Sequence, residues 1–131
     1  MSANQTQSGR FSNLDPDKLR GGYYTPTALA QWLCSWAIQS EQSTVLEPSC
    51  GDGSFLAAAA SRLLELGAQR PAVAQQIRGV EITEVEAEKA RARLSALVGS
   101  RGVDAVATGD FFEWWVEAAD TRFDCVVGNP P

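Results

Sequence analysis

The sequence predicts an α/β fold, with a parallel sheet and helices on both of its faces. Short apolar runs suited to buried strands alternate along the chain with longer segments of helical spacing. Glycine-containing loops join the two kinds of segment, as they do in strand–helix–strand units. Sheets of this kind bind ligands beyond the carboxyl ends of their strands, so we expect any functional site at that edge.

The first helix is predicted from its start signal and its apolar spacing. Thr25 followed by Pro26 is typical of an N-cap with proline at the first helical position. An apolar stripe is indicated by residues that then recur at helical spacing: Leu29, Trp32, Leu33, Trp36 and Ala37.

The later elements follow from similar signals. Gly67 after an apolar helical segment predicts a helix end, and Thr83 with Glu86 has the form of a capping box that opens another helix. In chain order, the expected elements are a helix from Thr25–Pro26 to about Gln39, a strand at 44–47, a glycine loop at 51–53, a helix at 54–66, a strand at 76–82, a helix from Thr83 to about Gly99, a strand at 103–108, a turn at 109–112, a brief helix at 113–119 and a strand at 122–127.

Length and charge limit the classes of protein that the chain can represent. It has 131 residues, which suits one domain; we expect a flexible lead-in at 1–20 and a folded domain at 21–131. The net charge of -5 and the lack of a basic run argue against this segment alone gripping a phosphate backbone. The first ten residues are polar and no long apolar stretch follows, so we expect no signal peptide and no membrane span. The expected location is therefore the cytoplasm.

The histidine and cysteine content limits the metal ligands and nucleophiles that the chain can supply. There is no histidine, which excludes histidine-dependent nucleophilic triads within the chain. The three cysteines are far apart and form no CxxC pair, which argues against a zinc site and against a disulfide framework; they are Cys34, Cys50 and Cys125.

Polar residues follow the four predicted strands at their carboxyl ends. Glu47 ends the first, Glu81 lies on the second, Asp110 follows the third and Asn129 follows the fourth. Because parallel strands end at one edge of a sheet, these side chains are expected to lie together.

The glycine loop after the first strand allows a sharp turn and close approach of a ligand at Gly51 and Gly53. The helix start near Ser54 would favour a carboxylate or another anion. An ordinary strand–helix turn is the simpler explanation of the glycines alone. An acid at the position of Glu81 commonly accepts hydrogen bonds from ribose hydroxyls. The alternative interpretation of Glu81 is a solvated carboxylate at the start of a helix.

Asp110 and Phe111 offer a carboxylate acceptor beside an aromatic ring, which suits the amino group and ring of an adenine. A turn aspartate with a core phenylalanine is the alternative. Phe112 is expected in the core, and Trp114 and Trp115 are assigned to packing.

Asn129-Pro130-Pro131 is the most specific signal. The prolines fix the backbone and remove two N–H donors, which leaves neighbouring carbonyls free to accept hydrogen bonds. Together with the Asn129 side-chain oxygen, they could accept both protons of an exocyclic amine and make its nitrogen nucleophilic. The alternative is a plain Asn-Pro turn.

These motifs, in this order, resemble the N6-adenine-specific DNA methyltransferases of the gamma group, the TaqI-like and restriction–modification type. The resemblance covers about residues 21–131. The motifs that carry it are Gly22-Tyr23-Tyr24-Thr25-Pro26, the segment Leu46-Glu47-Pro48-Ser49-Cys50-Gly51-Asp52-Gly53-Ser54-Phe55-Leu56, Gly79-Val80-Glu81-Ile82, Gly109-Asp110-Phe111-Phe112 and Gly128-Asn129-Pro130-Pro131.

The resemblance implies a Rossmann-like class I S-adenosyl-L-methionine-dependent methyltransferase fold, truncated here after the fourth parallel strand. It implies S-adenosyl-L-methionine as the cofactor and a flipped adenine of double-stranded DNA as the substrate. The implied cofactor-binding residues are Tyr24, Thr25 and Pro26 at the methionine end, Glu47, Pro48, Ser49, Cys50, Gly51 and Gly53 around its amino and carboxylate groups, Glu81 at the ribose, and Ile82, Asp110 and Phe111 at the adenine. The implied catalytic residues are Asn129, Pro130 and Pro131.

The chain departs from the family pattern at its end. The family motif continues with an aromatic residue after the two prolines, and the sequence stops at Pro131. We therefore expect an N-terminal fragment, inactive alone, that needs a C-terminal target-recognition domain or a partner chain. The alternatives are a methyltransferase acting on a protein glutamine or an RNA base, and a non-catalytic truncated or split module.

Overall fold

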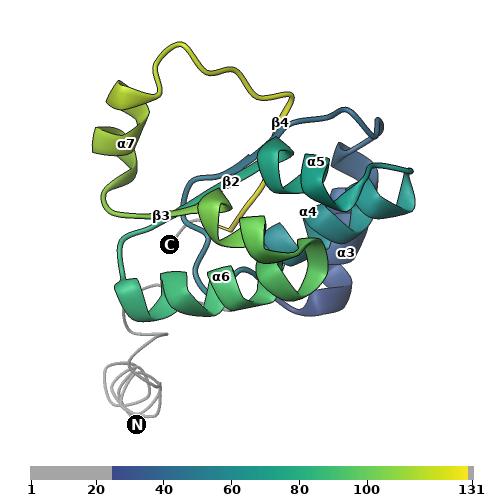
Figure 1. Cartoon of the computed structure of the whole chain (residues 1–131), viewed down its shortest axis with the longest axis horizontal. Coiled ribbons are helices and arrows are strands. Elements are labelled where there is room, and N and C mark those ends of the chain that lie inside the picture. The colour runs from purple at the N-terminus through teal and green to yellow at the C-terminus, as the bar shows by residue number, and fades with distance from the viewer. Residues whose placement is uncertain (1–24, 130–131) are drawn as a thin grey trace, which may run out of the picture.

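The computed structural model describes residues 25–129, which form a four-stranded parallel sheet with a layer of helices packed on it (Figure 1). The strand order is β3-β2-β1-β4. The elements are α3 (Thr27–Ala37), β1 (Val45–Glu47), α4 (Ser54–Glu65), α5 (Arg70–Gln76), β2 (Ile77–Glu81), α6 (Glu84–Val98), the 3-10 helix η1 (Ser100–Ala105), β3 (Val106–Thr108), α7 (Phe111–Glu117) and β4 (Cys125–Val126). The predicted α/β fold with a parallel sheet is confirmed. The expected lead-in at 1–20, Tyr24, Pro130 and Pro131 lie outside the described residues.

Strand β1 lies inside the sheet, between β2 and β4. Val45 is opposite Ile77 of β2 on one side and opposite Cys125 of β4 on the other. All pairs are parallel, so the carboxyl ends of the four strands lie at one edge of the sheet.

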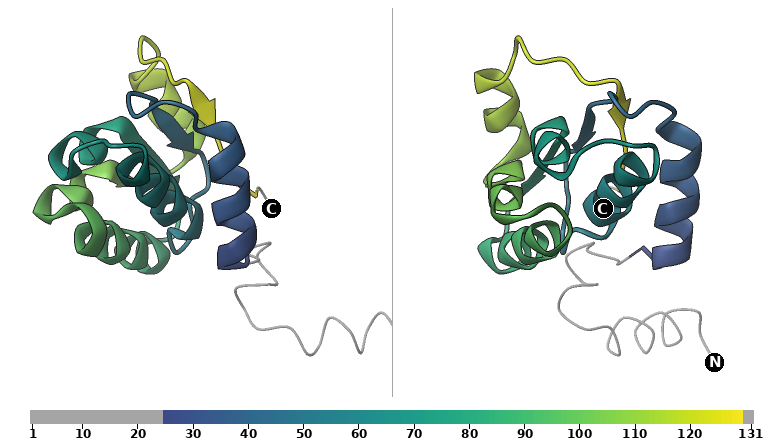
Figure 2. Two further views of the ribbon diagram at one scale, coloured as in Figure 1. Left: turned by 90° about the vertical axis from the view of Figure 1, so that its right-hand side faces the viewer. Right: turned by 45° about the vertical axis from the view of Figure 1, so that its right-hand side comes forward.

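One face of the sheet carries the main core. Helices α3, α4, α5 and α6 form a layer there, and Figure 2 shows this layer beside the sheet. Val45 and Ile77 point into it and are fully buried. The run of alanines in α4 lets that helix approach the strands closely, since small side chains occupy little space between helix and sheet.

The second face is covered differently. By strand alternation, Leu46 and Val80 point away from the helical layer, and both are buried. Helix α7 stands apart from the layer and contacts β2 (Figures 1 and 2). None of the seven residues of α7 is buried, so the described residues cover the two faces unequally.

Helix α3 has the predicted position, and its predicted apolar stripe is only partly right, since Leu33 and Ala37 pack against the core. The N-cap is Pro26 rather than Thr25. Ala30 and Cys34 face the core, whereas Trp32 and Trp36 are exposed. Periodicity alone could not choose between two stripes on the same helix.

Two short helices were not predicted, and both shorten a strand. Helix α5 precedes β2 and begins with a proline in its first turn. The 3-10 helix η1 takes up the first half of the expected third strand, and Gly102 within it lies close to the backbone of Leu94 in α6.

The remaining corrections also have local causes. The capping box does not form: the Thr83 amide is held by Glu81, and Glu86 binds Lys89. Strand β4 covers only Cys125–Val126, since the preceding Asp124 bonds Thr44 through its side chain as well as its backbone.

In the described part of the chain, no helix combines the length and the apolar character needed to cross a membrane.

Candidate functional site at the carboxyl ends of the strands

At the carboxyl ends of the strands, the residues that precede Asp110 and Asn129 lie next to the two strand-end acids, Glu81 and Glu47. Gly109, which precedes Asp110, donates its amide hydrogen bond to the carbonyl of Glu81 at 2.9 Å. Beside β1, the Val127 amide donates to the Leu46 carbonyl at 3.0 Å, which places the next residue, Gly128, against Glu47. The four strand ends therefore lie at one edge of the sheet, and the meeting of the Asp110 and Asn129 side chains with the two acids stays a prediction.

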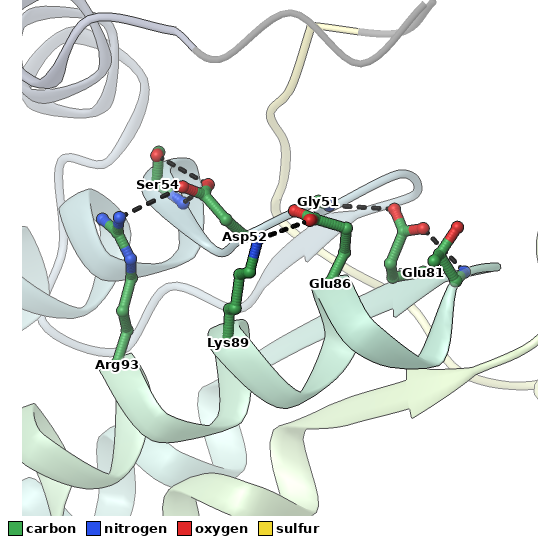
Figure 3. A network of polar contacts seen from close by, with 8 residues as sticks. Gly51, Asp52, Ser54, Glu81, Glu86, Lys89 and Arg93 are labelled. Atoms are coloured by element: carbon green, nitrogen blue, oxygen red, sulfur yellow. Dashed lines mark hydrogen bonds and ion pairs between the residues drawn. The ribbon is translucent and has the colours of Figure 1, made fainter. Parts of the chain in front are cut away.

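The amides of the glycine loop donate hydrogen bonds to a carbonyl and a carboxylate oxygen of the neighbouring strand. The Cys50 amide donates to the Val80 carbonyl at 2.9 Å, and the Gly51 amide donates to Glu81 Oε1 at 3.1 Å (Figure 3). The Gly53 amide closes the turn on the Cys50 carbonyl at 2.9 Å. These bonds fix the loop before any ligand arrives.

Helix α6 packs against the same loop. Gly53 has a φ of +90°, and a Cβ there would lie 2.8 Å from the Ala90 Cα, so both backbone conformation and space require glycine. Gly51 has a φ of +54° and open space around it. The loop is thus tight on its α6 side and open at Gly51.

Asp52 and Arg93 complete the loop, and sequence reasoning missed both. Asp52 Oδ1 accepts from the Ser54 amide and hydroxyl, while its Oδ2 accepts from Arg93 at 3.1 Å (Figure 3). The Asp52–Ser54 spacing is an Asx-turn signal that could have identified the aspartate. No local signal points to Arg93.

Glu81 is a fixed, buried carboxylate. Only 8% of the residue is exposed, so the interpretation as a solvated carboxylate is wrong. Its Oε1 accepts from the Gly51 amide and its Oε2 accepts from the Thr83 amide at 2.8 Å. A carboxylate offers about four acceptor positions, so capacity for ligand hydroxyls remains. The next residue, Ile82, is 69% exposed and presents an apolar surface beside it.

Glu47 is a second buried acid, with 3% of its surface exposed. Its Oε1 accepts from the Ser49 amide at 2.9 Å. Burial raises the pKa of Glu47 from 4.5 to about 8, against the lowering effect of the Ser49 hydrogen bond, and the charge of Glu81 raises it further. Among the ion pairs of the described residues, none includes Glu47. A buried acid in this state favours a cationic ligand.

The cysteines have the character of core residues. Cys50 is buried beneath the loop beside Gly79, so its contribution to the site is through its backbone. Burial raises the pKa of the Cys50 thiol strongly, and burial likewise raises the pKa of Cys34 to about 11. Both thiols are therefore protonated at neutral pH and poor nucleophiles.

Asp110 caps α7, which explains why that helix begins at Phe111, earlier than predicted. Its Oδ1 accepts from the Phe112 amide at 2.9 Å and from the Glu113 amide at 3.1 Å. Phe111 stacks on Trp114, with ring centroids 6.0 Å apart. Phe112 is 76% exposed, so its predicted place in the core is wrong.

Two predicted residues belong to the start of α3. The Pro26 carbonyl accepts from the Ala30 amide at 3.0 Å. The hydrogen bonds of the described residues do not tie Thr25 or Pro26 to the strand ends. Within residues 25–129, no group of three acidic or cysteine side chains is arranged to hold a metal ion.

Comparison with known proteins connects this arrangement to DNA methylation. Residues 11–131 match the model of the N-6 DNA Methylase family. Over 111 residues, the chain is 29% identical to the type II methyltransferase M.CvrRI of Paramecium bursaria Chlorella virus XZ-6E. The alignment covers 85% of this chain and 24% of that relative.

A second relative agrees with the first. The chain is 28% identical over 131 residues to the type II methyltransferase M.PaeR7I of Pseudomonas aeruginosa, covering 86% of this chain and 23% of the relative. The chain thus spans about a quarter of the length of these curated relatives. Since the family match extends over nearly all of its residues, the chain belongs to the N-6 DNA methylase family.

Proposed function

We propose that the chain is the cofactor-binding and catalytic part of a gamma-group DNA methyltransferase that methylates N6 of adenine. One observation carries the proposal: the buried acids Glu47 and Glu81 hold amides of the segment that follows β1, and Glu47 also lies beside Gly128, which precedes Asn129. The fold proposed for the whole domain is the Rossmann-like class I methyltransferase fold, to which the parallel sheet is suited.

The residues at the strand ends suit S-adenosyl-L-methionine. The buried acid Glu47 has no cationic partner in the described ion pairs, and it would receive the amino group of the cofactor. Glu81 has spare acceptor capacity for the ribose hydroxyls, and exposed Ile82 would lie against the adenine. The full proposed set is Tyr24, Thr25, Pro26, Glu47, Pro48, Ser49, Cys50, Gly51, Gly53, Glu81, Ile82, Asp110 and Phe111.

The proposed catalytic residues act on the amine of the substrate. The Asn129 side-chain oxygen and the Pro130 carbonyl would accept the two N6 protons of an adenine turned out of the duplex. The amine nitrogen then keeps its lone pair out of the ring and becomes nucleophilic, and Pro131 keeps the backbone rigid. S-adenosyl-L-methionine, when bound, supplies the electrophilic methyl group.

We assign binding of the DNA duplex to the rest of a longer protein or to a partner chain. The net charge of -5 gives this segment little attraction for phosphates. A target-recognition domain beyond Pro131 would supply that attraction, and the chain alone would then be inactive. We place the protein in the cytoplasm, where its three free cysteines would remain reduced.

Calorimetry with S-adenosyl-L-methionine tests the cofactor assignment. We expect the chain to bind it, and Glu81→Ala to weaken binding at least tenfold. Glu65→Ala is the matched control, since Glu65 lies at the far end of α4, and its affinity should stay within twofold. A folded chain that releases no heat would contradict the proposal.

Methyl transfer tests the substrate. A chain extended to the length of the relatives, supplied with cofactor carrying a tritiated methyl group, should label duplex DNA and yield N6-methyladenine on digestion. Asn129→Ala should abolish labelling while cofactor affinity is unchanged. Labelling of a protein glutamine or an RNA base instead would favour the alternative substrates, and no labelling at all would favour a non-catalytic split module.

A further inference from the structure

Gly128 and Glu47 are in direct contact at the edge of the site. A Cβ placed on Gly128 would lie 2.5 Å from Oε1 and 2.7 Å from Oε2 of Glu47, so the carboxyl group occupies the space that a side chain at Gly128 would need. Gly128 has a φ of +154°. Gly109 has nearly the same φ, +149°, yet a Cβ there would meet nothing within 4 Å. The contact at Gly128 is therefore specific to Glu47.

The Glu47 carboxyl group also contacts the loop after β1, which we propose binds the cofactor. Its Oε1 accepts from the Ser49 amide at 2.9 Å. One end of β1 thus touches both the loop that would bind the cofactor and the turn that carries Asn129.

We propose that Glu47 is a positioning residue that couples occupancy of the cofactor pocket to the placement of Asn129. Binding of a cationic amino group beside Glu47 would convert its carboxyl group to a carboxylate, and Gly128 would respond to that change. The inference rests on the proposed function, because it takes the cofactor's amino group as the ligand.

The protonation state of Glu47 makes such coupling possible. Its pKa of about 8 leaves the carboxyl group largely neutral at pH 7. Among residues 25–129, the titratable groups that interact with Glu47 are Glu81, Cys34 and Cys50, and none of these three supplies a positive charge. An ammonium group would therefore displace the proton of Glu47 to solvent and pair with the carboxylate.

Proton loss changes what Glu47 can do at Gly128. A neutral carboxyl group has an O–H donor, whereas a carboxylate is only an acceptor. The carboxyl oxygens lie beside Gly128, so the electrostatic field at the turn changes with the charge of Glu47.

Nuclear magnetic resonance of the 131-residue chain tests the contact without any ligand. The amide signals of Gly128 and Asn129 should shift with a midpoint near pH 8, and Glu47→Gln should remove that transition. Glu65→Gln, the same change at an exposed acid, should leave it in place. A Gly128 amide with no transition near pH 8 in the wild-type chain would overturn the proposal.

Calorimetry at pH 7, in two buffers of different ionisation enthalpy, tests the coupling to the ligand. S-adenosylhomocysteine has the amino group and should release about one proton per molecule bound. 5′-Methylthioadenosine lacks that group and should release none. Glu47→Gln should bind S-adenosylhomocysteine without proton release.

The outcomes separate the two proposals. Tight binding of S-adenosylhomocysteine with no proton release would overturn the role of Glu47 and leave the proposed function standing. Failure of a folded chain to bind either compound would overturn both.

Discussion

The loop after β1 and the turn after β4 lie at the same edge of the sheet but are held in different ways. Hydrogen bonds from β2 and Glu81 hold the loop at Cys50 and Gly51, and α6 packs against Gly53. The turn follows a two-residue edge strand and rests on the carboxyl group of Glu47.

This difference follows from position in the sheet. Strand β1 has partners on both sides, whereas β4 pairs only with β1 in the described chain. Backbone bonds and helix packing shape the proposed cofactor half of the site, while the proposed catalytic half has one backbone bond, from the Val127 amide to Leu46, and an ionisable neighbour, Glu47. Substitutions in the loop and in the turn should therefore change the stability of the protein in different ways.

The largest expected effect is at Gly53. Gly53→Ala combines left-handed backbone strain with collision against Ala90, so we expect a loss of about 2–5 kcal/mol in the free energy of unfolding. Gly51→Ala carries the strain without the collision and should lose about 1–2 kcal/mol. Urea unfolding measures both, and equal losses would contradict the tight packing against α6.

The next effect is a pH dependence due to Glu47. Its folded-state pKa of about 8 is above the usual 4.5, so the folded chain binds the proton more tightly than the unfolded chain. This contribution to stability is complete below about pH 4.5 and is lost as the pH rises to about 8. Glu47→Gln should therefore become more stable than wild type, by a few kcal/mol, between pH 5 and pH 9.

Thermal and urea unfolding across that pH range check this prediction. Glu65→Gln is the control and should run parallel to wild type. A constant difference between wild type and Glu47→Gln at every pH would show that the carboxyl group does not titrate in this window.

A smaller effect separates Gly128 from Gly109. Both have similar positive φ values, so alanine carries similar backbone strain at each position. Only at Gly128 would the new methyl group meet Glu47, and the excess loss of stability there should be about 1–3 kcal/mol. Urea unfolding of the two variants gives the comparison, and a greater loss at Gly109 would contradict the contact.

The smallest effect concerns the ion pair that joins α6 to the loop. Arg93 is half-exposed, so Arg93→Ala should lower the free energy of unfolding by no more than about 1 kcal/mol. Asp52→Ala should cost more, because the hydrogen bonds to Ser54 are lost as well. The same unfolding experiment ranks the two, and the reverse order would mean that Arg93 dominates the anchoring of the loop.

The sequence predicted what depends on local pattern. The alternation of strands and helices follows from apolar spacing, and the place of Glu47 and Glu81 follows from where the apolar runs end. Helix α5 was missed because its seven residues carry too short an apolar pattern.

The contacts that shape the site could not be predicted in the same way. Arg93 reaches Asp52 from another helix, and Gly128 meets Glu47 from another strand. Such pairs leave no periodic signal in one sequence. The alternative for Asp110 was a turn aspartate; its role as the N-cap of α7 was not predicted, and it accounts for the early start of that helix.

The most direct test of the account maps the ligand onto the strand ends. Amide signals of the isotope-labelled chain should be followed while S-adenosyl-L-methionine is added. We predict shifts at Gly51, Ile82 and Gly128, with the indole signals of exposed Trp32 and Trp36 unchanged. Shifts confined to α3, or no shifts in a folded chain, would contradict a common site at the carboxyl ends of the strands.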